Sequence, residues 1–359
     1  MHTVKIEDKS LYSVFQPIYS FSNQACIGAE VLIRGKKLDS DEPISVYECL
    51  LEPPGMSKVD FTQSVNRMHL SNWKESEPSE NWIFLNLDFN NVNSLDDLCL
   101  HDILNELDFK GQEIVVEVVE SEIKDERLFE NLIAVLRDLG CLIALDDFGA
   151  GHSNIDRIWK AQPDIVKLDR QVMLEATKSI RSQSLLRNLT KLIQQAGSVC
   201  LLEGIETRDQ AMLAMDVGVD LVQGFYFGKP EASLADLNRG QVLVKEITEQ
   251  YPVYLSEKQF VKSIQAKGYA TLFETLSSLS SLEKIEEEMQ KVSVFSFVKR
   301  FFILDSDGYQ VSEEVEVSIP QGNHHDVLKK GKGLCWKNRR YFVKLMAQPQ
   351  ELYVSEPYR

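Results

Sequence analysis

The amino-acid sequence predicts an α/β protein, a (β/α)8 barrel followed by a smaller α+β domain. Three observations predict the barrel. Apolar runs alternate with helical patterns over roughly 240 residues, which is the usual length of such a barrel. Several of these runs are continuously apolar, as is typical of parallel strands that are buried on both faces. Acidic or amide side chains follow most of the runs, and the chemistry of these barrels takes place at the strand ends.

Strands and helices are expected in alternation. The predicted strands are residues 14–19, 26–33, 82–87, 113–118, 141–145, 165–168, 199–202 and 220–227. Apolar residues at helical spacing predict helices over 128–139 and 185–196, and Gly140 and Gly197 follow them as expected helix ends. An open, doubly wound sheet is the main alternative. It would bind its ligand in one crevice and would not need a polar residue at nearly every strand end.

A change of pattern after about Lys245 predicts a second domain. We expect the first domain over residues 1–245 and the second over 246–359. The second segment, about 110 residues long, lies within the normal size range of a domain. Because the sequence stops directly after the strand-like segment ELYVSE, we expect this domain to be incomplete.

Helical and strand patterns both occur in this second segment. Apolar residues that step by three or four from Leu272 to Val292 predict one long amphipathic helix. The Asp307-Gly308 pair between strand-like runs predicts a hairpin. A further strand is expected over 340–345. Together these elements indicate an α+β domain.

Composition and charge narrow the classes of function. The net charge of −16 disfavours binding to polymeric nucleic acid or to an anionic membrane, because its field repels both. The 6 cysteines include no CxxC pair, which favours buried thiols in a reducing compartment over a disulfide framework. The 6 histidines show no zinc-site spacing. With no apolar signal core and no run near the ~18 residues of a membrane span, we expect a cytoplasmic protein.

Strand-end side chains predict a site for divalent cations. They are Glu30, Asn86, Glu117, Asp146, Asp147 and Glu203. A carboxylate at the end of a buried strand is costly unless something neutralises it, and Mg²⁺ prefers carboxylate and amide oxygens as ligands. The sequence therefore predicts a metal-dependent enzyme.

Two carboxylate pairs refine this prediction. Neighbours in a strand face opposite sides, so Asp146 and Asp147 can reach one site only if the strand ends there, and residues 148–151 are expected to supply the break. One shared and one private carboxylate would then suit two cations a few ångströms apart. Glu117 and Glu120 lie three apart and should differ in role, one as a ligand and one as a support.

Basic and amide residues complete the predicted site. Lys167 closes a strand and could orient a water or stabilise developing phosphoryl charge. Arg34, four residues after Glu30, could form a forked contact with a phosphate. Gln223 belongs to the next candidate strand after Glu203.

Seven motifs over residues 10–240 resemble those of the EAL-domain phosphodiesterases of bacterial cyclic di-GMP signalling. They are AEVLIR, LNLDF, VVEVVESEI, ALDDFGAGHSN, DIVKLDR, LLEGIET and DLVQGFYFGKP. Each motif is weak alone, as DFG also occurs in kinases, but no glycine-rich loop or HRD partner accompanies it here. The order of all seven is very specific. The resemblance implies hydrolysis of cyclic di-GMP to the linear dinucleotide pGpG with two Mg²⁺ or Mn²⁺ ions.

The resemblance also implies roles for individual residues. The implied metal ligands are Glu30, Asn86, Glu117, Asp146, Asp147 and Glu203. The implied catalytic residues are Lys167, which positions the attacking water, Glu203, and Glu120, which braces the loop 147–154. The implied substrate-binding residues are Gln16, Leu32, Arg34 and Gln223, with Asp169 and Glu206 in the surrounding shell. The family also implies a homodimer with the loop 148–154 near the interface.

The chain departs from the family pattern at a few positions. The motif after which the family is named, Glu-Ala-Leu, reads Glu-Val-Leu in this chain. Val31 is expected to point away from the metals. The loop carries Ala150, His152 and Asn154 in place of the usual Thr, Tyr and Ser. These changes bear on the stiffness of the loop and on the rate rather than on metal binding.

Two classes of function are consistent with this pattern. The first is an active phosphodiesterase, regulated by its C-terminal domain. The alternative is a catalytically silent relative that acts as a cyclic di-GMP receptor or through protein contacts. Because every expected ligand is present, activity is favoured. A different metal hydrolase would have to keep the whole motif set by chance. The segment FFILDSDGYQV after the long helix resembles sensory modules of the PAS/Cache kind, whose ligand the sequence does not name.

Overall fold

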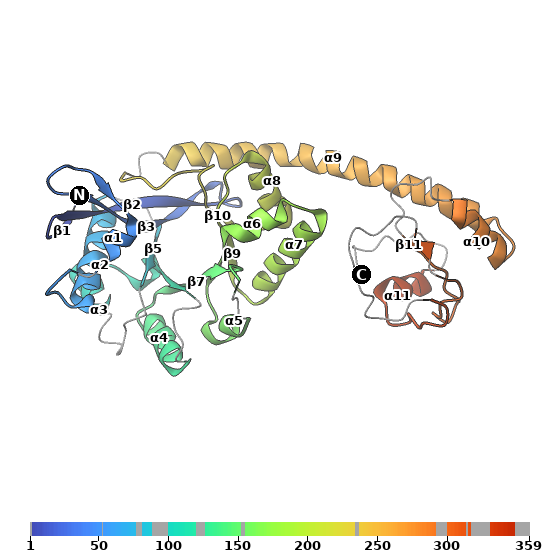
Figure 1. The fold of residues 1–359 in the computed structure, drawn as a ribbon, viewed down its shortest axis with the longest axis horizontal. Coiled ribbons are helices and arrows are strands. Elements are labelled where there is room, and N and C mark those ends of the chain that lie inside the picture. Colours follow the sequence, from blue (N-terminus) through green and yellow to red (C-terminus); the bar gives the residue numbers. More distant parts are fainter. Residues whose placement is uncertain are drawn as a thin grey trace. The chain divides into compact units, whose positions relative to one another are not determined.

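The chain divides into two compact units, Met1–Pro252 and Val253–Arg359, in the computed structural model (Figure 1). The structure describes residues 2–51, 53–76, 81–87, 100–119, 126–151, 155–233, 237–291, 300–313, 315–316 and 331–348. Among these residues, no helix is long and apolar enough to cross a membrane.

An eight-stranded barrel forms the first unit, which confirms the predicted fold class. Its strands are β2 (Lys9–Ser20), β3 (Ala25–Lys37), β5 (Trp82–Asn86), β6 (Ile114–Val119), β7 (Leu142–Phe148), β8 (Ile165–Leu168), β9 (Val199–Leu202) and β10 (Leu221–Val222). They pair in the order β2-β10-β9-β8-β7-β6-β5-β3, and the β2–β3 pair closes the barrel. Two short strands, β1 (Val4–Ile6) and β4 (Pro43–Ile44), extend the β2–β3 hairpin.

The direction of β2 differs from the expected parallel barrel. This strand runs antiparallel to both of its neighbours, β3 and β10, whereas the other barrel pairs are parallel. The reason lies in residues 21–24, because so short a connection permits a hairpin but not the crossover that parallel strands need.

Helices surround the barrel (Figure 1). They are α1 (Val46–Leu50), α2 (Lys58–Glu75), α3 (Leu100–Glu106), α4 (Glu126–Asp138), α5 (Ile155–Ala161), α6 (Arg170–Ala176), α7 (Ile180–Gln195) and α8 (Arg208–Val217), with a short 3-10 turn at Gly111–Glu113. The two helices predicted from apolar spacing are α4 and α7. Gly140 and Gly197 follow them with φ of 78° and 92°, the left-handed conformation that ends helices.

An apolar layer fills the barrel interior towards the end where the parallel strands begin. It consists of Ile18, Phe84, Val115, Ala144, Ile165, Leu201 and Leu221, one from each strand except β3. On β3 the corresponding residue is Gly28, where an added Cβ would lie 3.1 Å from the Phe84 ring. This layer is the floor on which the polar site rests.

The last barrel strand is much shorter than the predicted 220–227. Only Leu221–Val222 form β10. The backbone beyond it bonds instead to the loop after β9, since Ile205 N donates to Gln223 O and Tyr226 N donates to Ile205 O. Gly224 permits this approach, because a Cβ there would lie 2.2 Å from Ile205 O.

Helix α9 (Leu237–Ser277) begins against the barrel, and the predicted domain boundary after residue 245 falls inside it. Its buried residues Val244 and Ile247 face the first unit. Gly240 lies so close to Tyr19 that an added Cβ would be 2.1 Å from the phenol oxygen. The start of α9 is therefore packed tightly on the barrel.

The predicted helix from Leu272 to Val292 is interrupted in the structure. Helix α9 ends at Ser277, and α10 covers Leu282–Lys291. Serines explain the break, because their hydroxyls compete for backbone groups. Ser278 Oγ donates to Thr275 O, and Ser281 Oγ accepts from Lys284 N.

The rest of the second unit contains one confirmed and one wrong prediction. The hairpin is confirmed, because Leu304 pairs with Gln310 around a turn in which Gly308 has a φ of 80°. Strands β11 (Arg300–Phe301) and β12 (Val315–Glu316) pair nearby. The strand expected at 340–345 is wrong, because these residues lie in helix α11 (Arg340–Ala347). The run ends in Lys, Leu, Met and Ala, all good helix formers.

Candidate active site

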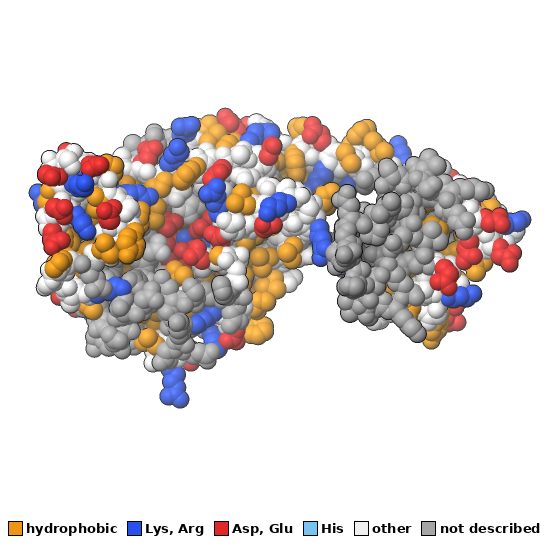
Figure 2. All heavy atoms as spheres, in the orientation of Figure 1, with side chains coloured by type: hydrophobic (Ala, Val, Ile, Leu, Met, Phe, Trp, Pro, Cys, Tyr) orange, Lys and Arg blue, Asp and Glu red, His pale blue; other side chains and the backbone are white. Residues whose placement is uncertain are grey.

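Polar side chains form a second layer directly above the apolar layer of the barrel. Each lies two residues from a floor residue, or from Gly28, on the same strand or its continuation, and side chains two apart on a strand face the same side. They are Gln16, Glu30, Asn86, Glu117, Asp146, Lys167, Glu203 and Gln223. Figure 2 shows acidic side chains gathered in a hollow of this unit.

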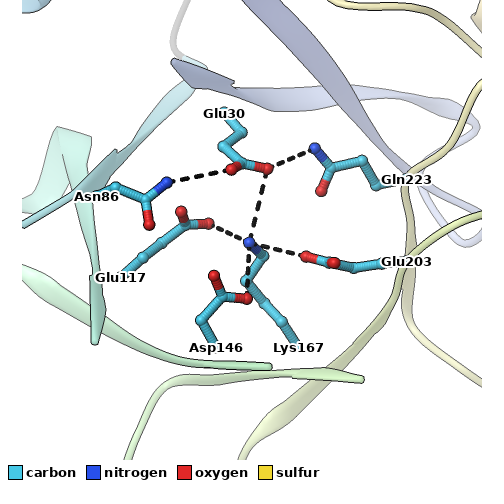
Figure 3. Close-up of polar contacts among 7 residues, drawn as sticks. All are labelled: Glu30, Asn86, Glu117, Asp146, Lys167, Glu203 and Gln223. Atoms are coloured by element: carbon cyan, nitrogen blue, oxygen red, sulfur yellow. Dashed lines mark hydrogen bonds and ion pairs between the residues drawn. The ribbon is translucent and has the colours of Figure 1, made fainter. Parts of the chain in front are cut away.

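Lys167 lies at the centre of this polar layer (Figure 3). Its Nζ is 2.6 Å from Glu117 Oε1, 2.8 Å from Glu203 Oε1 and 3.0 Å from Asp146 Oδ1. A fourth carboxylate oxygen, Glu30 Oε2, lies at 3.6 Å. The lysine is 1% exposed, so these charges meet in a nearly dry environment.

Amide side chains hold Glu30 from both sides. Asn86 Nδ2 donates to Glu30 Oε1 at 3.1 Å, and Gln223 Nε2 donates to Glu30 Oε2 at 2.8 Å (Figure 3). The two amides reach across from β5 and from the end of β10. They fix the carboxylate at the mouth of the barrel, while Gln223 Oε1 accepts no hydrogen bond from the described residues.

The charges of the cluster are unbalanced. Four carboxylates and one ammonium give a formal excess of three negative charges. Burial, together with the charge of Glu30, raises the pKa of Glu117 well above its usual value. Burial also raises the pKa of Glu203, although Lys167 opposes this shift. Burial alone would lower the pKa of Lys167, but the surrounding carboxylates outweigh it and raise that pKa.

Asp146 and Asp147 are brought together by a β-bulge rather than by the end of the strand. Strand β7 continues to Phe148, which pairs with Leu168, and the register shifts between Leu145 and Phe148. Asp147 has a φ of 55°, a left-handed conformation that aspartate tolerates better than most residues. Burial and the charge of Asp146 raise the pKa of Asp147. The strand was expected to end at residues 148–151. It instead contains a bulge between Leu145 and Phe148.

Predicted substrate-binding residues line one face of the β2–β3 hairpin. Gln16 lies directly opposite Glu30 in this antiparallel pair, so their side chains share a face. Leu32 and Arg34 follow Glu30 at intervals of two and lie on the same face. Arg34 Nη1 donates to the carbonyl of Ile33 at 2.7 Å. The structure therefore continues the polar layer outward along β3.

Other predicted residues lie away from the central cluster or outside the described residues. Asp169 caps α6 by accepting from Gln171 N at 2.8 Å. Glu206 pairs with Arg170 at 2.9 Å. Both therefore support the surrounding loops and do not contact Lys167. Glu120, together with His152 and Asn154, lies outside the described residues.

Phe225 is an exposed aromatic residue that was not among the predicted site residues. This residue follows the Gln223-Gly224 pair and is 55% exposed, with Lys229 Nζ 5.6 Å from its ring centre. Its position directly after Gly224, in the loop that follows Gln223, is the feature of the sequence that could have identified it. An exposed aromatic ring thus lies two residues after Gln223 in the chain.

The oxygen donors of the site fit hard divalent cations. Glu117 Oε2 and Gln223 Oε1 are buried and accept no hydrogen bond from the described residues. The negative excess also favours cations over any other ligand. As the side chains stand, no three His, Cys, Asp or Glu residues of the described segments converge as a metal group. Lys167 takes the central position instead, so cation binding would require carboxylates to turn from the lysine.

The barrel and its buried acidic layer indicate the class of protein, and a family model matches the same part of the chain. The family model of the EAL domain matches residues 2–230. The chain therefore belongs to the EAL domain family. The comparisons do not identify the C-terminal region as a PAS or Cache module.

Several characterised and uncharacterised proteins are similar in sequence. The chain is 27% identical over 318 residues to YkuI, an uncharacterised EAL-domain protein of Bacillus subtilis, and the match covers 84% of this chain and 76% of YkuI. It is 30% identical over 130 residues to RocR, a cyclic di-GMP phosphodiesterase of Pseudomonas aeruginosa. That match covers 36% of this chain and only 33% of RocR.

Solved structures share the fold. The crystal structure of YkuI with cyclic di-GMP and calcium has a TM-score of 0.70 at 24% identity, covering 93% of this chain and 85% of that one. Klebsiella pneumoniae BlrP1, in a complex with manganese and cyclic di-GMP, has a TM-score of 0.55 at 22% identity, covering 62% of this chain and 56% of that one. Because both identities are below 25%, these similarities show a shared fold and nothing more.

Proposed function

We propose that this chain hydrolyses cyclic di-GMP to the linear dinucleotide pGpG with the aid of two divalent cations. The observation that carries the proposal is the buried layer in which Lys167 meets four carboxylates at one end of an EAL-family barrel. Membership of the family, and the similarity to the phosphodiesterase RocR, support this choice of substrate.

The cations would be magnesium or manganese. The residues that would hold them are Glu30, Asn86, Glu117, Asp146, Asp147 and Glu203. Two such ions would neutralise the phosphate charge and favour ionisation of an attacking water. The bulge at Asp146 and Asp147 supports the pairing, because it lets two successive carboxylates serve one site.

Two residues would act on the attacking water. Lys167 would orient it and Glu203 would accept its proton. The ammonium of Lys167 donates hydrogen bonds and would orient the water oxygen towards the phosphorus. Glu203 lies 2.8 Å from that ammonium and has a raised pKa, and it would accept the proton. One phosphorus–oxygen bond forms to the water and one breaks to the ribose oxygen, which takes up a proton. We propose Glu120 as the brace of the loop that carries Asp147.

The substrate would lie along the β2–β3 hairpin. The guanidinium of Arg34 can offer a fork to a phosphate, Gln16 and Leu32 line the same face, and Gln223 reaches Glu30 from the end of β10. Asp169 and Glu206 would support the loops around the site.

We further propose a homodimer formed through the residues around Phe148–Asn154. The first helix after this loop carries large exposed apolar side chains. Ile155 is 45% exposed and Trp159 is 70% exposed. A symmetric contact would bury them, as most homo-oligomers are symmetric.

Regulation is the role proposed for the C-terminal region, with catalysis assigned to residues 1–245. Every proposed catalytic group precedes α9, and the start of α9 is packed on Tyr19 at Gly240. A fragment ending at Pro252 is the better test, because it keeps the buried Ile247. A changed turnover in this fragment, relative to the full chain, would support regulation. A folded fragment that is inactive would show that the C-terminal region contributes to the chemistry.

Conversion of cyclic di-GMP by the purified full chain tests the proposed function. We expect pGpG to accumulate with Mg²⁺ or Mn²⁺ and not with the Lys167→Met variant, as followed by anion-exchange chromatography. The alternative, a silent cyclic di-GMP receptor, would bind the dinucleotide without converting it. Binding with no product at any concentration of either metal would therefore favour the receptor over the enzyme.

A further inference from the structure

The first turn of α6 lies between two segments that carry carboxylates of the site. Strand β8 lies between β7 and β9 in the sheet, and α6 begins with Arg170, three positions after Lys167. Strand β7 ends one residue after Asp147, and the segment after β9 begins with Glu203. The turn is therefore placed to contact both segments.

Arg170 packs on the segment that carries Glu203. A Cβ added to Gly204 would lie 2.5 Å from the Cβ of Arg170, so the arginine occupies the space that any other residue would need. Gly204 also has a φ of 67°, in the left-handed region that favours glycine. The guanidinium of Arg170 reaches Glu206, with Nη2 2.9 Å from Oε1. One side chain thus contacts this segment at two points directly after Glu203.

Val172 makes the matching contact with the segment that follows Asp147. A Cβ added to Gly149 would overlap the Cγ2 methyl of this valine. Gly149 has a φ of 101°, so its conformation also favours glycine. The backbone supports the same approach, since Asp169 N donates to Phe148 O at 3.1 Å. The turn is therefore packed directly against the residues that follow the bulge.

We propose that the first turn of α6 sets the separation between Glu203 and the adjacent aspartates of the bulge, with Arg170 and Val172 as its positioning residues. The inference rests on the proposed function, in which these carboxylates serve one two-cation site. Lys167 holds Glu203 from within the barrel at 2.8 Å. Because cation binding would turn the carboxylates away from Lys167, contacts on the other side of each segment would then keep them in place.

The packing of the Arg170 side chain, rather than its charge, should carry most of this effect. The side chains of Arg170 and Glu206 are 52% and 38% exposed, and exposed ion pairs contribute little to stability. The methylene groups of an arginine can cover a surface while the charged head stays in water. Methionine would keep this covering chain without the charge, whereas alanine would keep only the Cβ.

Turnover of cyclic di-GMP by variants of the full chain tests this proposal. Arg170→Ala should lower kcat by roughly 10- to 100-fold with little change in KM, because a displacement of about 1 Å can cost 10²-fold in rate. Arg170→Met should stay within about fivefold of the unmodified chain, the most that an exposed ion pair is usually worth. Val172→Ala should lower kcat as well. If it turns over like the unmodified chain, the contact with Gly149 has no positioning role.

A double-mutant cycle shows whether Arg170 acts through Glu203. In the Glu203→Gln chain, Arg170→Ala should lower kcat by less than about twofold, since the group that it positions is already lost. Arg187→Ala is the matched control, because this partly exposed arginine joins α7 to α8 through Asp216 and should leave kcat unchanged. A loss from Arg170→Ala that is the same with and without Glu203 would overturn the proposal.

The same cycle measured by urea denaturation in EDTA needs no turnover. Glu203→Gln removes a partner of Lys167, and it should shift the urea midpoint less in the Arg170→Ala chain than in the unmodified chain. Midpoint shifts that simply add would show that Arg170 does not position Glu203. If the unmodified chain does not hydrolyse cyclic di-GMP and the shifts are non-additive, the proposed function fails while the positioning of Glu203 stands.

Discussion

Replacing Lys167 with methionine, which is similar in size, should destabilise the metal-free protein and abolish turnover. The substitution removes the only cation of the described cluster and leaves Glu30, Glu117, Asp146 and Glu203 facing one another. Removing one partner from a buried ion pair typically costs about 3–5 kcal/mol of stability. We expect a loss of this size in EDTA at pH 8.

The pH dependence of this loss follows from the pKa shifts. The pKa of Lys167 is raised by the fold, so its stabilising effect is complete below its ordinary value of 10.5 and disappears only above that pH. The pKa values of Glu117 and Glu203 are also raised, so their ionised forms disfavour the fold as pH rises above 4.5. Protonation relieves this repulsion. Lys167 opposes both shifts, so its removal should raise both pKa values further, and the cost of Lys167→Met should grow as pH rises above about 8, where Glu203 ionises in the unmodified fold, by at most about 1.4 kcal/mol per pH unit for each carboxylate.

Urea denaturation of both proteins at pH 7 and pH 9, with EDTA or Mg²⁺, measures this effect. We expect the variant to lose less at pH 7 than at pH 9 in EDTA. Added Mg²⁺ should restore part of the loss at pH 9, because it supplies the missing positive charge. Turnover should remain at least about 10²-fold lower even in saturating Mg²⁺, since the water is no longer oriented. A stability loss that is the same at both pH values would refute the electrostatic reasoning.

Other predictions concern the metals, the loop, the dimer and a buried histidine. Turnover should require Mg²⁺ or Mn²⁺ and be inhibited by Ca²⁺, whose longer bonds misplace the reacting groups; rapid hydrolysis in excess chelator would contradict this. Glu120→Ala should lower turnover while one cation still binds, as seen in a titration with Mn²⁺, and wild-type behaviour would remove its role as a brace. Trp159→Glu should shift the mass measured by light scattering from dimer to monomer, and a monomeric unmodified chain would disprove the interface. Burial lowers the pKa of His69 to about 3, so unfolding free energy should fall from pH 6.5 downwards by at most about 1.4 kcal/mol per unit, and His69→Gln should flatten that slope in urea titrations.

The barrel and its polar layer were predictable because both depend on simple periodicities. A buried strand reads as an apolar run, and a polar residue two positions past a floor residue must face the same interior. Ala144 and Asp146, or Leu201 and Glu203, illustrate this spacing. Their convergence follows once the strands are parallel and in register. The sequence thus contained the positions of the site, although not the central place of Lys167 among the carboxylates.

Features that depend on backbone direction or on local competition were not predictable in the same way. An apolar run carries no direction, so the antiparallel β2 could be inferred only from the short connection at 21–24. The bulge at Asp147 depends on one residue adopting a positive φ. The run at 340–347 is too short to separate helix from strand by its apolar residues, and the helix-forming residues at its end decide the outcome.

The bulge connects these two kinds of feature. A regular strand would direct Asp146 into the barrel and Asp147 out of it, and only one carboxylate could then serve the site. One extra residue in β7 turns the second aspartate without ending the strand, because Phe148 resumes pairing with Leu168. The fold therefore keeps the sheet closed on the floor side while it places two carboxylates at the mouth. This arrangement would suit the proposed two-cation site, because two successive carboxylates could then reach it while Phe148 returns to the sheet.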